Sequence, residues 1–351
     1  MALGATALCL IAAAASAAPA GKVLAPGNFI HVIGSVERTV AFYHDVLGLD
    51  LVSARGVGQF APNPAVAKLY AIPAATPMSV AMLRLPERSV ALEFAEFRGI
   101  THNSSAPRPQ DPGASVLVLT VRSLDPVLAR VRAAHVPIVT RGAVPVDRSD
   151  SAGKSRIVVV RDPDGYYIEL VERDPAPAPA PAAAADAAGN VLQASLMLSI
   201  ADTDKTLHLY RDLLGLQFRV DDSFARDPVL SRALGIRGEA QVRHSVAGIP
   251  GSDFKVDFVQ WKAVRRKPAH TRVFDRGVGV LRLVVDNVDS FVDQLKADGV
   301  PVASAGDGPV ALNAVFHACI LSDPNGFFFE LVPQFRPRAR PPPQSRRHNP
   351  P

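Results

Sequence analysis

The chain has 351 residues, which is enough for two domains that each bury a hydrophobic core. Its formal net charge of +5 resides in the C-terminal run FRPRARPPPQSRRHNPP, which holds five arginines and no acidic residue. The rest of the chain is therefore about neutral, and this excludes the basic face of a nucleic-acid-binding protein.

The first 20 residues have the character of an export signal. Residues 1–20, MALGATALCLIAAAASAAPA, carry no charge and combine a short apolar centre with small residues suited to cleavage near Ala17 or Ala20. The first basic residue is Lys22, so either the natural start lies upstream or the signal is atypical. We expect a periplasmic or extracellular protein without stable membrane insertion after cleavage. Cys319 would then be its one thiol, which excludes an internal disulfide.

Two sequence patterns occur twice. The segment VAFYHDVLGLDL at 40–51 returns as TLHLYRDLLGLQF at 206–218, and RDPDGYYIELV at 161–171 returns as SDPNGFFFELV at 322–332. Repetition at a fixed spacing indicates that each half folds in the same way. The sequence therefore predicts a tandem duplication.

Each half contains two segments in which a β-type run leads into a capped amphipathic helix. The β-type runs are 29–33, 115–121, 195–200 and 278–285. The predicted helix caps are Ser35, Ser123, Asp202 and Asn287. A left-handed residue is expected to end each helix, and the four are Gly48, His135, Gly215 and Gly299.

Further strands follow each helix. The candidates are 80–85, 90–97, 156–161, 166–171, 255–261 and 327–332. The turns DPDG and DPNG place Pro second and Gly fourth, as a type I turn prefers. Each segment thus predicts a strand, a helix and about three strands, a βαβββ unit.

An Ala-Pro stretch separates the two halves. Alternating Ala and Pro is extended and forms no core, so it acts as a semi-rigid spacer. The predicted organisation is a signal peptide, a first domain, a linker, a second domain and a disordered Arg/Pro tail, over residues 1–20, 27–173, 174–189, 190–334 and 335–351.

The repeated motifs resemble the vicinal oxygen chelate superfamily, which includes glyoxalase I, bleomycin resistance proteins and extradiol dioxygenases. The resemblance covers residues 27–173 and 190–334. It implies an α+β fold with tandem domains, in which two βαβββ units form a half-open curved sheet around a cavity.

Metal enzymes of that superfamily bind their metal from the first and last strands of their units. Carried onto this chain, the resemblance places these positions at Asn28, Glu93, Val116 and Glu169 in the first half and at Ser195, Asp257, Val280 and Glu330 in the second. Both halves keep two carboxylates and lack the histidines. Such a donor set is poor for zinc or iron but can hold manganese or magnesium weakly.

One alternative places His31 in the metal site. Strand alternation from Asn28 directs His31 toward the helix side instead. Another alternative is that Arg84 or Arg156 neutralises Glu93 and Glu169, which interrupt apolar strands.

Two functional hypotheses follow. The leading one is an exported protein, monomer or homodimer, that binds a small molecule in its cavities without a tightly held transition metal, through Asn28, Glu93, Glu169, Asp257 and Glu330. The competing one is a lyase, isomerase or dioxygenase-type enzyme that uses manganese or magnesium weakly bound between Glu93 and Glu169.

Overall fold

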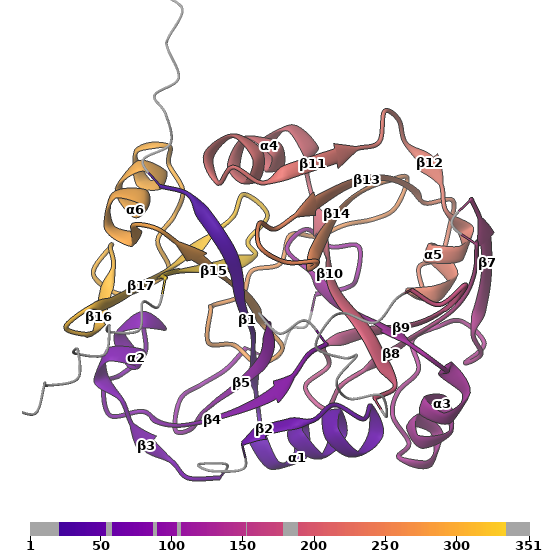
Figure 1. Ribbon diagram of the computed structural model, residues 1–351, viewed down its shortest axis with the longest axis horizontal. Coiled ribbons are helices and arrows are strands. Elements are labelled where there is room, and N and C mark those ends of the chain that lie inside the picture. The colour runs from indigo at the N-terminus through magenta and orange to yellow at the C-terminus, as the bar shows by residue number, and fades with distance from the viewer. Residues whose placement is uncertain are drawn as a thin grey trace, which may run out of the picture.

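A computed structural model describes residues 21–53, 58–86, 90–103, 107–151, 153–177 and 189–334 (Figure 1). The predicted signal peptide, the C-terminal tail and residues 178–188 of the linker lie outside these ranges. No helix in the described part of the chain is long and apolar enough to cross a membrane.

Four units succeed one another along the chain. Unit 1 contains β1 (Val23–Ile33), α1 (Val36–Ala41), the π-helical segment η1 (Phe42–Val46), β2 (Leu51–Ser53), β3 (Ala61–Pro62), α2 (Pro64–Leu69), β4 (Pro77–Arg84) and β5 (Ala91–Phe97). Unit 2 contains β6 (Ser115–Val121), α3 (Leu124–Ala133), β7 (Val146–Asp150), β8 (Gly153–Arg161) and β9 (Tyr167–Asp174).

The second half repeats this order. Unit 3 contains β10 (Val191–Ile200), α4 (Thr203–Leu207), η2 (His208–Leu213), β11 (Gln217–Val220), β12 (Ala225–Arg226), α5 (Pro228–Ala233), β13 (Gln241–Gly248) and β14 (Lys255–Lys262). Unit 4 contains β15 (Gly279–Val285), α6 (Val288–Ala297), β16 (Val310–Asn313), β17 (Phe316–Ser322) and β18 (Phe328–Pro333).

Three of the four predicted caps bind the first turn of their helix. The side chains of Ser35, Asp202 and Asn287 accept hydrogen bonds from backbone N–H groups there. Ser123 makes no such bond. The third residue of this helix is Pro126, which has no N–H to donate, and Glu172 accepts the Leu124 N–H at 2.6 Å. The predicted helix-ending residues Gly48, His135, Gly215 and Gly299 all have positive φ, which confirms their left-handed conformation.

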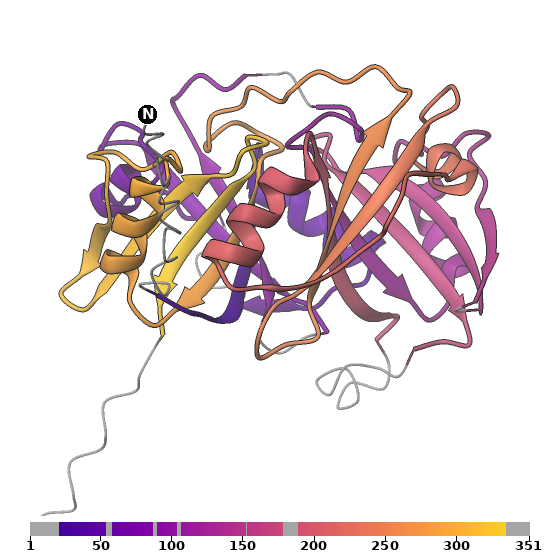
Figure 2. The ribbon, with the colours of Figure 1, turned by 90° about the horizontal axis from the view of Figure 1, so that it is seen from above.

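The strands form two open sheets, as predicted for the fold. Sheet A has the order β16-β17-β18-β15-β1-β5-β4-β2, and sheet B has the order β11-β13-β14-β10-β6-β9-β8-β7. Each sheet combines one unit from each half of the chain: β1 pairs antiparallel with β15, and β6 pairs antiparallel with β10. Figure 1 shows β1 in indigo beside β15 in orange, and Figure 2 shows units 1 and 4 at one end of the molecule.

The largest hydrophobic core is shared by all four units. It includes Phe29, Leu124, Tyr210 and Phe291, each from a different unit. Smaller buried clusters lie on the other face of each sheet, around Ile30 in sheet A and around Val116, Met197 and Trp261 in sheet B. Because side chains alternate along a strand, one face of each sheet packs into the large core with α1, α3, α6 and η2. The other face, together with α2 in sheet A or α5 in sheet B, surrounds a cavity.

Candidate ligand-binding cavities

The two sheets correspond strand by strand. Read in reverse, the order of sheet B matches that of sheet A, so that β1, β5, β15 and β18 correspond to β10, β14, β6 and β9. Corresponding strands therefore surround corresponding positions in the two sheets.

Strand register fixes which residues correspond. Glu93 lies beside Ile30 of β1, and Asp257 lies beside Met197 of β10. Glu330 lies beside Arg282 of β15 in sheet A.

In sheet B, Glu169 lies beside Val118 of β6. Glu93 therefore corresponds to Asp257, Glu330 to Glu169, and Arg282 to Val118.

The cavity of sheet A, here called cavity A, has a volume of about 440 Å³. Its walls are mostly apolar, and its polar residues are Asn63, Glu93, Arg282 and Glu330. The other lining residues are Ala61, Pro62, Val66, Leu69, Tyr70, Met78, Val80 and Leu312. A mainly apolar cavity of this size with a few convergent polar groups is typical of a small-molecule site.

Arg282 bridges the two carboxylates of cavity A. Its Nε donates to Glu330 Oε2 at 2.8 Å, and its Nη1 donates to Glu93 Oε2 at 2.8 Å. The Asn28 amide also donates to Glu93 Oε2, at 2.8 Å. The alternative that Arg84 or Arg156 neutralises Glu93 is wrong: Arg282 pairs with Glu93, and Arg156 pairs with Asp125 at 2.7 Å.

The backbone makes room for this guanidinium. A Cβ at Gly27 would lie 2.7 Å from Cγ of Arg282, so only glycine lets the arginine stem pass β1 without a shift. The arginine is therefore a built-in part of cavity A.

Burial shapes the electrostatics of cavity A. Burial raises the pKa of Glu330, although Arg282 acts in the opposite direction. Burial also raises the pKa of Tyr70, and the nearby Glu330 and Glu93 raise it further. Glu330 is 1 % exposed, and its Oε1 has no hydrogen-bond partner. Two carboxylates share one guanidinium, so cavity A keeps an acceptor for a ligand.

The cavity of sheet B, here called cavity B, is smaller and more polar. Its volume is about 190 Å³. The residues that line it include Arg148, Glu169, Arg173, Ser195, His244 and Asp257. Asp257 Oδ2 lies 2.8 Å from His244 Nδ1, and Arg148 Nη2 donates to Asp227 Oδ2 at 2.7 Å.

Glu169 has an unusual environment in cavity B. Burial raises its pKa to about 7; Arg148 and Arg173 act against this rise, and Asp257 adds to it. Oε2 of Glu169 and Oδ1 of Asp257 are buried and have no hydrogen-bond partner. The pKa of His244 is raised because Asp257 outweighs the opposing effect of burial.

The predicted site residues divide between the cavities. Asn28, Glu93 and Glu330 come together in sheet A, whereas Glu169, Asp257 and Ser195 line cavity B. The expectation that Glu93 and Glu169 hold a metal together is wrong, because β5 and β9 belong to different sheets. Repeats reveal the units of a fold but not which of their edges pair.

Two of the expected metal positions are plain core residues. Val116 and Val280 are buried in the apolar clusters of sheets B and A, respectively. Two functional residues were missed. Arg282 stands inside an otherwise apolar run and His244 lies in β13, a strand that the sequence analysis did not identify.

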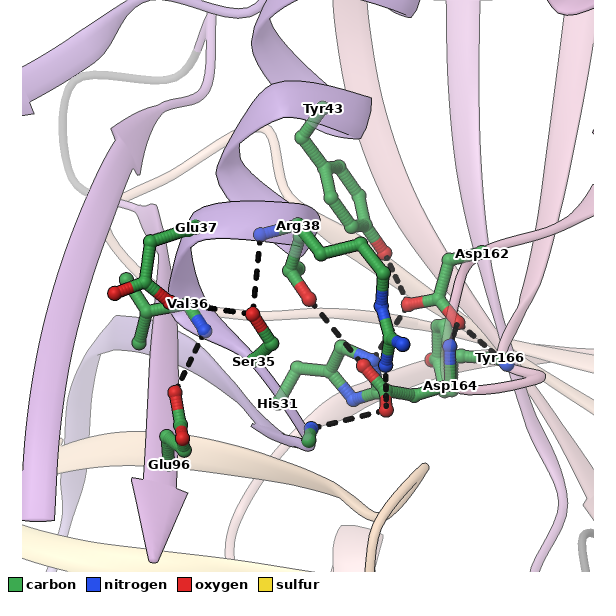
Figure 3. A network of polar contacts seen from close by, with 12 residues as sticks. His31, Ser35, Val36, Glu37, Arg38, Tyr43, Glu96, Asp162, Asp164 and Tyr166 are labelled. Carbon is green, nitrogen blue, oxygen red and sulfur yellow. Dashed lines mark hydrogen bonds and ion pairs between the residues drawn. The ribbon is translucent and has the colours of Figure 1, made fainter. Parts of the chain in front are cut away.

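His31 faces away from the cavities, as strand alternation predicts (Figure 3). Its Nε2 lies 2.7 Å from Asp162 Oδ2, and its Nδ1 lies 3.3 Å from the Val278 carbonyl oxygen. Tyr43 also donates to Asp162 Oδ2, at 3.2 Å. Burial alone would lower the pKa of His31, but Asp162 and Asp164 raise it. Since both ring nitrogens face acceptors, the geometry suits the charged imidazolium.

Cavity A does not fit a metal ion. One oxygen of each carboxylate already binds Arg282, at 2.8 Å. A divalent cation bound to the same carboxylates would lie close to this guanidinium, and the two positive charges would repel each other. In the described ranges, no three His, Cys, Asp or Glu side chains are arranged to hold a metal ion.

The chain is similar to known proteins in sequence and fold. A lactoylglutathione lyase, GLX1, from Arabidopsis thaliana is 25 % identical over 231 residues, which span 62 % of this chain and 64 % of the relative. The match thus covers less than two thirds of that relative's length.

Solved structures agree on the fold. Glyoxalase I from Zea mays matches with a TM-score of 0.53 at 15 % identity, covering 89 % of this chain and 92 % of that one. A putative dioxygenase from Bacillus subtilis matches with a TM-score of 0.50 at 16 % identity, covering 89 % and 86 %.

The family itself is identified by sequence. The sequence model of the Glyoxalase/Bleomycin resistance protein/Dioxygenase superfamily matches residues 28–170 and 193–331, which is most of both halves. The chain belongs to this superfamily.

Proposed function

We propose that the protein binds a small organic molecule in cavity A without a tightly held metal ion. The observation that carries the proposal is the bridge from Arg282 to Glu93 and Glu330 at the polar end of a mostly apolar cavity. The protein's own cation takes the position between the carboxylates, so recognition depends on shape and hydrogen bonding.

The lining of cavity A indicates the ligand's chemistry. Val66, Leu69, Tyr70, Met78 and Leu312 offer apolar contact to the body of a ligand. At the other end, the unpartnered Glu330 Oε1 calls for a hydrogen-bond donor. We infer a ligand with an apolar body and a hydroxyl or amine at one end.

We also propose that the protein acts outside the cytoplasm, as a monomer or homodimer. The support for export is the uncharged, Ala-rich character of residues 1–20. Sequencing the mature N-terminus of the natively expressed protein tests export. Cleavage near Ala17 or Ala20 is expected, and an intact N-terminus in a cytoplasmic fraction contradicts it.

Methionine methyl groups report on the two cavities separately. Met78 lines cavity A, and Met197 lines cavity B. The sulfur of Met82 lies 3.6 Å from the side-chain nitrogen of Asn28, which binds Glu93 of cavity A. With ¹³C-methyl methionine, benzyl alcohol and benzylamine serve as probes. We expect the signals of Met78 and Met82 to shift while that of Met197 stays in place.

A matched pair of variants localises the binding. Val80→Trp places a bulky ring at a 41 % exposed residue that lines cavity A and should abolish the response of Met78. Val144→Trp, at a similar exposure of 43 % outside the lining, should leave that response unchanged. An unmoved Met78 signal with every probe contradicts the proposal. So does a stoichiometric metal ion that is lost in Glu93→Gln.

A further inference from the structure

Cavity B has the carboxylates of cavity A but lacks its guanidinium. Asp257 and Glu169 correspond to Glu93 and Glu330, and the residue that corresponds to Arg282 is Val118. Val118 lines cavity B and cannot donate a hydrogen bond.

The two cavities have exchanged polar and apolar positions. By register, Val80 of β4 in cavity A corresponds to His244 of β13 in cavity B. Arg148 of β7 adds a second basic residue to the walls of cavity B. Cavity A thus has a guanidinium between its carboxylates and mostly apolar walls, whereas cavity B has Val118 beside its carboxylates and basic residues in its walls.

The charged side chains in the walls of cavity B are partly engaged with other groups, and Arg148 Nε has no hydrogen-bond partner. Arg148 is paired with Asp227, and His244 binds one oxygen of Asp257. Arg173 is solvent-exposed at the end of β9. Among the described residues, no side chain bridges Glu169 and Asp257 as Arg282 bridges Glu93 and Glu330 in cavity A.

Two buried carboxylate oxygens in cavity B have no hydrogen-bond donor. Glu169 is only 8 % exposed, and its Oε2 has no partner although the residue lines the cavity. Asp257 Oδ1 is likewise buried and without a partner. Buried carboxylate oxygens are costly to leave unsatisfied, so this pair is suited to accept hydrogen bonds from a bound group.

We propose that cavity B is a binding site for a small external cation with a planar guanidinium or amidinium group, held between Glu169 and Asp257. The chain supplies its own template for this complex in Arg282, whose guanidinium spans the corresponding carboxylates at 2.8 Å on each side. A guanidinium is planar, weakly hydrated and donates in a fork that matches carboxylates. The volume of about 190 Å³ limits the ligand to a small molecule.

The site is independent of the ligand proposed for cavity A, because the two lie on different sheets and have different reporters. The test uses methylguanidinium as the probe and follows the methyl signal of Met197, which lines cavity B. Methylurea has nearly the same shape without the charge and is the control. We expect methylguanidinium to shift the Met197 signal at millimolar concentration and methylurea to leave it in place.

Two variants separate the proposed contact from general effects. Glu169→Gln keeps the shape of the side chain and removes the charge that Glu169 carries above its pKa of about 7, so at pH 8 the affinity for methylguanidinium should fall by roughly tenfold or more. Val118→Arg places a guanidinium where Arg282 stands in sheet A and should abolish the response.

Should Val118→Arg fail to fold, Glu169→Gln alone still decides. A Met197 signal that methylguanidinium leaves unmoved, or that methylurea moves equally, overturns the proposal. Unchanged affinity in Glu169→Gln overturns it as well. A response of Met78 to benzyl alcohol is unaffected by any of these outcomes and tests cavity A alone.

Discussion

Val118 of β6 and Arg282 of β15 occupy corresponding positions in the two sheets, yet one is apolar and the other is a guanidinium held by two carboxylates. This one difference gives the duplicated cavities different chemistry. In sheet A, Arg282 binds one oxygen of each carboxylate, and Glu330 Oε1 has no partner. In sheet B the described residues form no such bridge, and Glu169 Oε2 and Asp257 Oδ1 have no partner.

Removing the guanidinium should destabilise the protein strongly. Arg282→Met keeps the apolar stem but leaves Glu93 and the fully buried Glu330 without their cation. Breaking one partner from a buried ion pair costs about 3–5 kcal/mol. We expect urea unfolding to show a loss of this size.

The double variant and a surface control sharpen this test. Arg282→Met with Glu330→Gln removes one of the stranded charges and should recover part of the loss. Arg84→Met, at an exposed position of β4, should change the free energy of unfolding by less than about 0.5 kcal/mol. A single variant as stable as the wild type would show that the bridge contributes nothing.

The raised pKa of Glu169 predicts how stability depends on pH. The folded state holds its proton up to about pH 7, whereas an ordinary glutamate loses it near 4.5. The folded state therefore binds more protons in this window. Protonation of Glu169 in the folded state adds to the free energy of unfolding. This contribution, about 3 kcal/mol, is complete below pH 4.5 and is lost as the pH rises to about 7.

Glu169→Gln should remove this dependence, because glutamine stays neutral. The measurement is the difference in free energy of unfolding between wild type and variant at pH 5 and pH 8, where all other groups cancel. Relative to the wild type, the variant's free energy of unfolding should be a few kcal/mol higher at pH 8 than at pH 5. A constant difference at both values would mean that Glu169 is ionised throughout.

The repeated tyrosines offer a matched pair. Tyr43 donates to Asp162 of the DPDG turn at 3.2 Å, and Tyr210 donates to Asp323 of the DPNG turn at 3.3 Å. Both rings are fully buried, so Tyr→Phe deletes the hydroxyl with little change in packing. Each variant should lose about 1–3 kcal/mol by thermal or urea unfolding.

The two tyrosine variants should also be additive, since their hydrogen bonds share no partner. The double variant should lose the sum of the single losses within about 0.5 kcal/mol. A markedly larger loss in one single variant than in the other would show that the two repeats are stabilised differently.

Much of the fold could be predicted from local patterns. The repeats indicate four units, the caps at Ser35, Asp202 and Asn287 behave as helix caps, and alternation correctly turns His31 from the cavity. These features depend on neighbouring residues, so a single sequence contains them.

What could not be predicted depends on distant pairing. Each unit begins with an apolar strand, and nothing local tells β1 to pair with β15 rather than with β6. Arg282 meets Glu93, 189 residues away, only because of that choice. The same choice separates Glu93 from Glu169, because it places β5 and β9 in different sheets.

The guanidinium of Arg282 organises the polar end of cavity A. Arg282→Ala opens a gap between Glu93 and Glu330, and a small molecule of the right chemistry should fill it. The decisive measurement is the melting temperature of this variant with millimolar methylguanidinium, methylurea or a divalent metal ion. We predict that methylguanidinium raises the melting temperature toward that of the wild type while methylurea does not. If the metal ion raised the melting temperature equally, or if methylguanidinium did not raise it, a guanidinium would not be what organises cavity A.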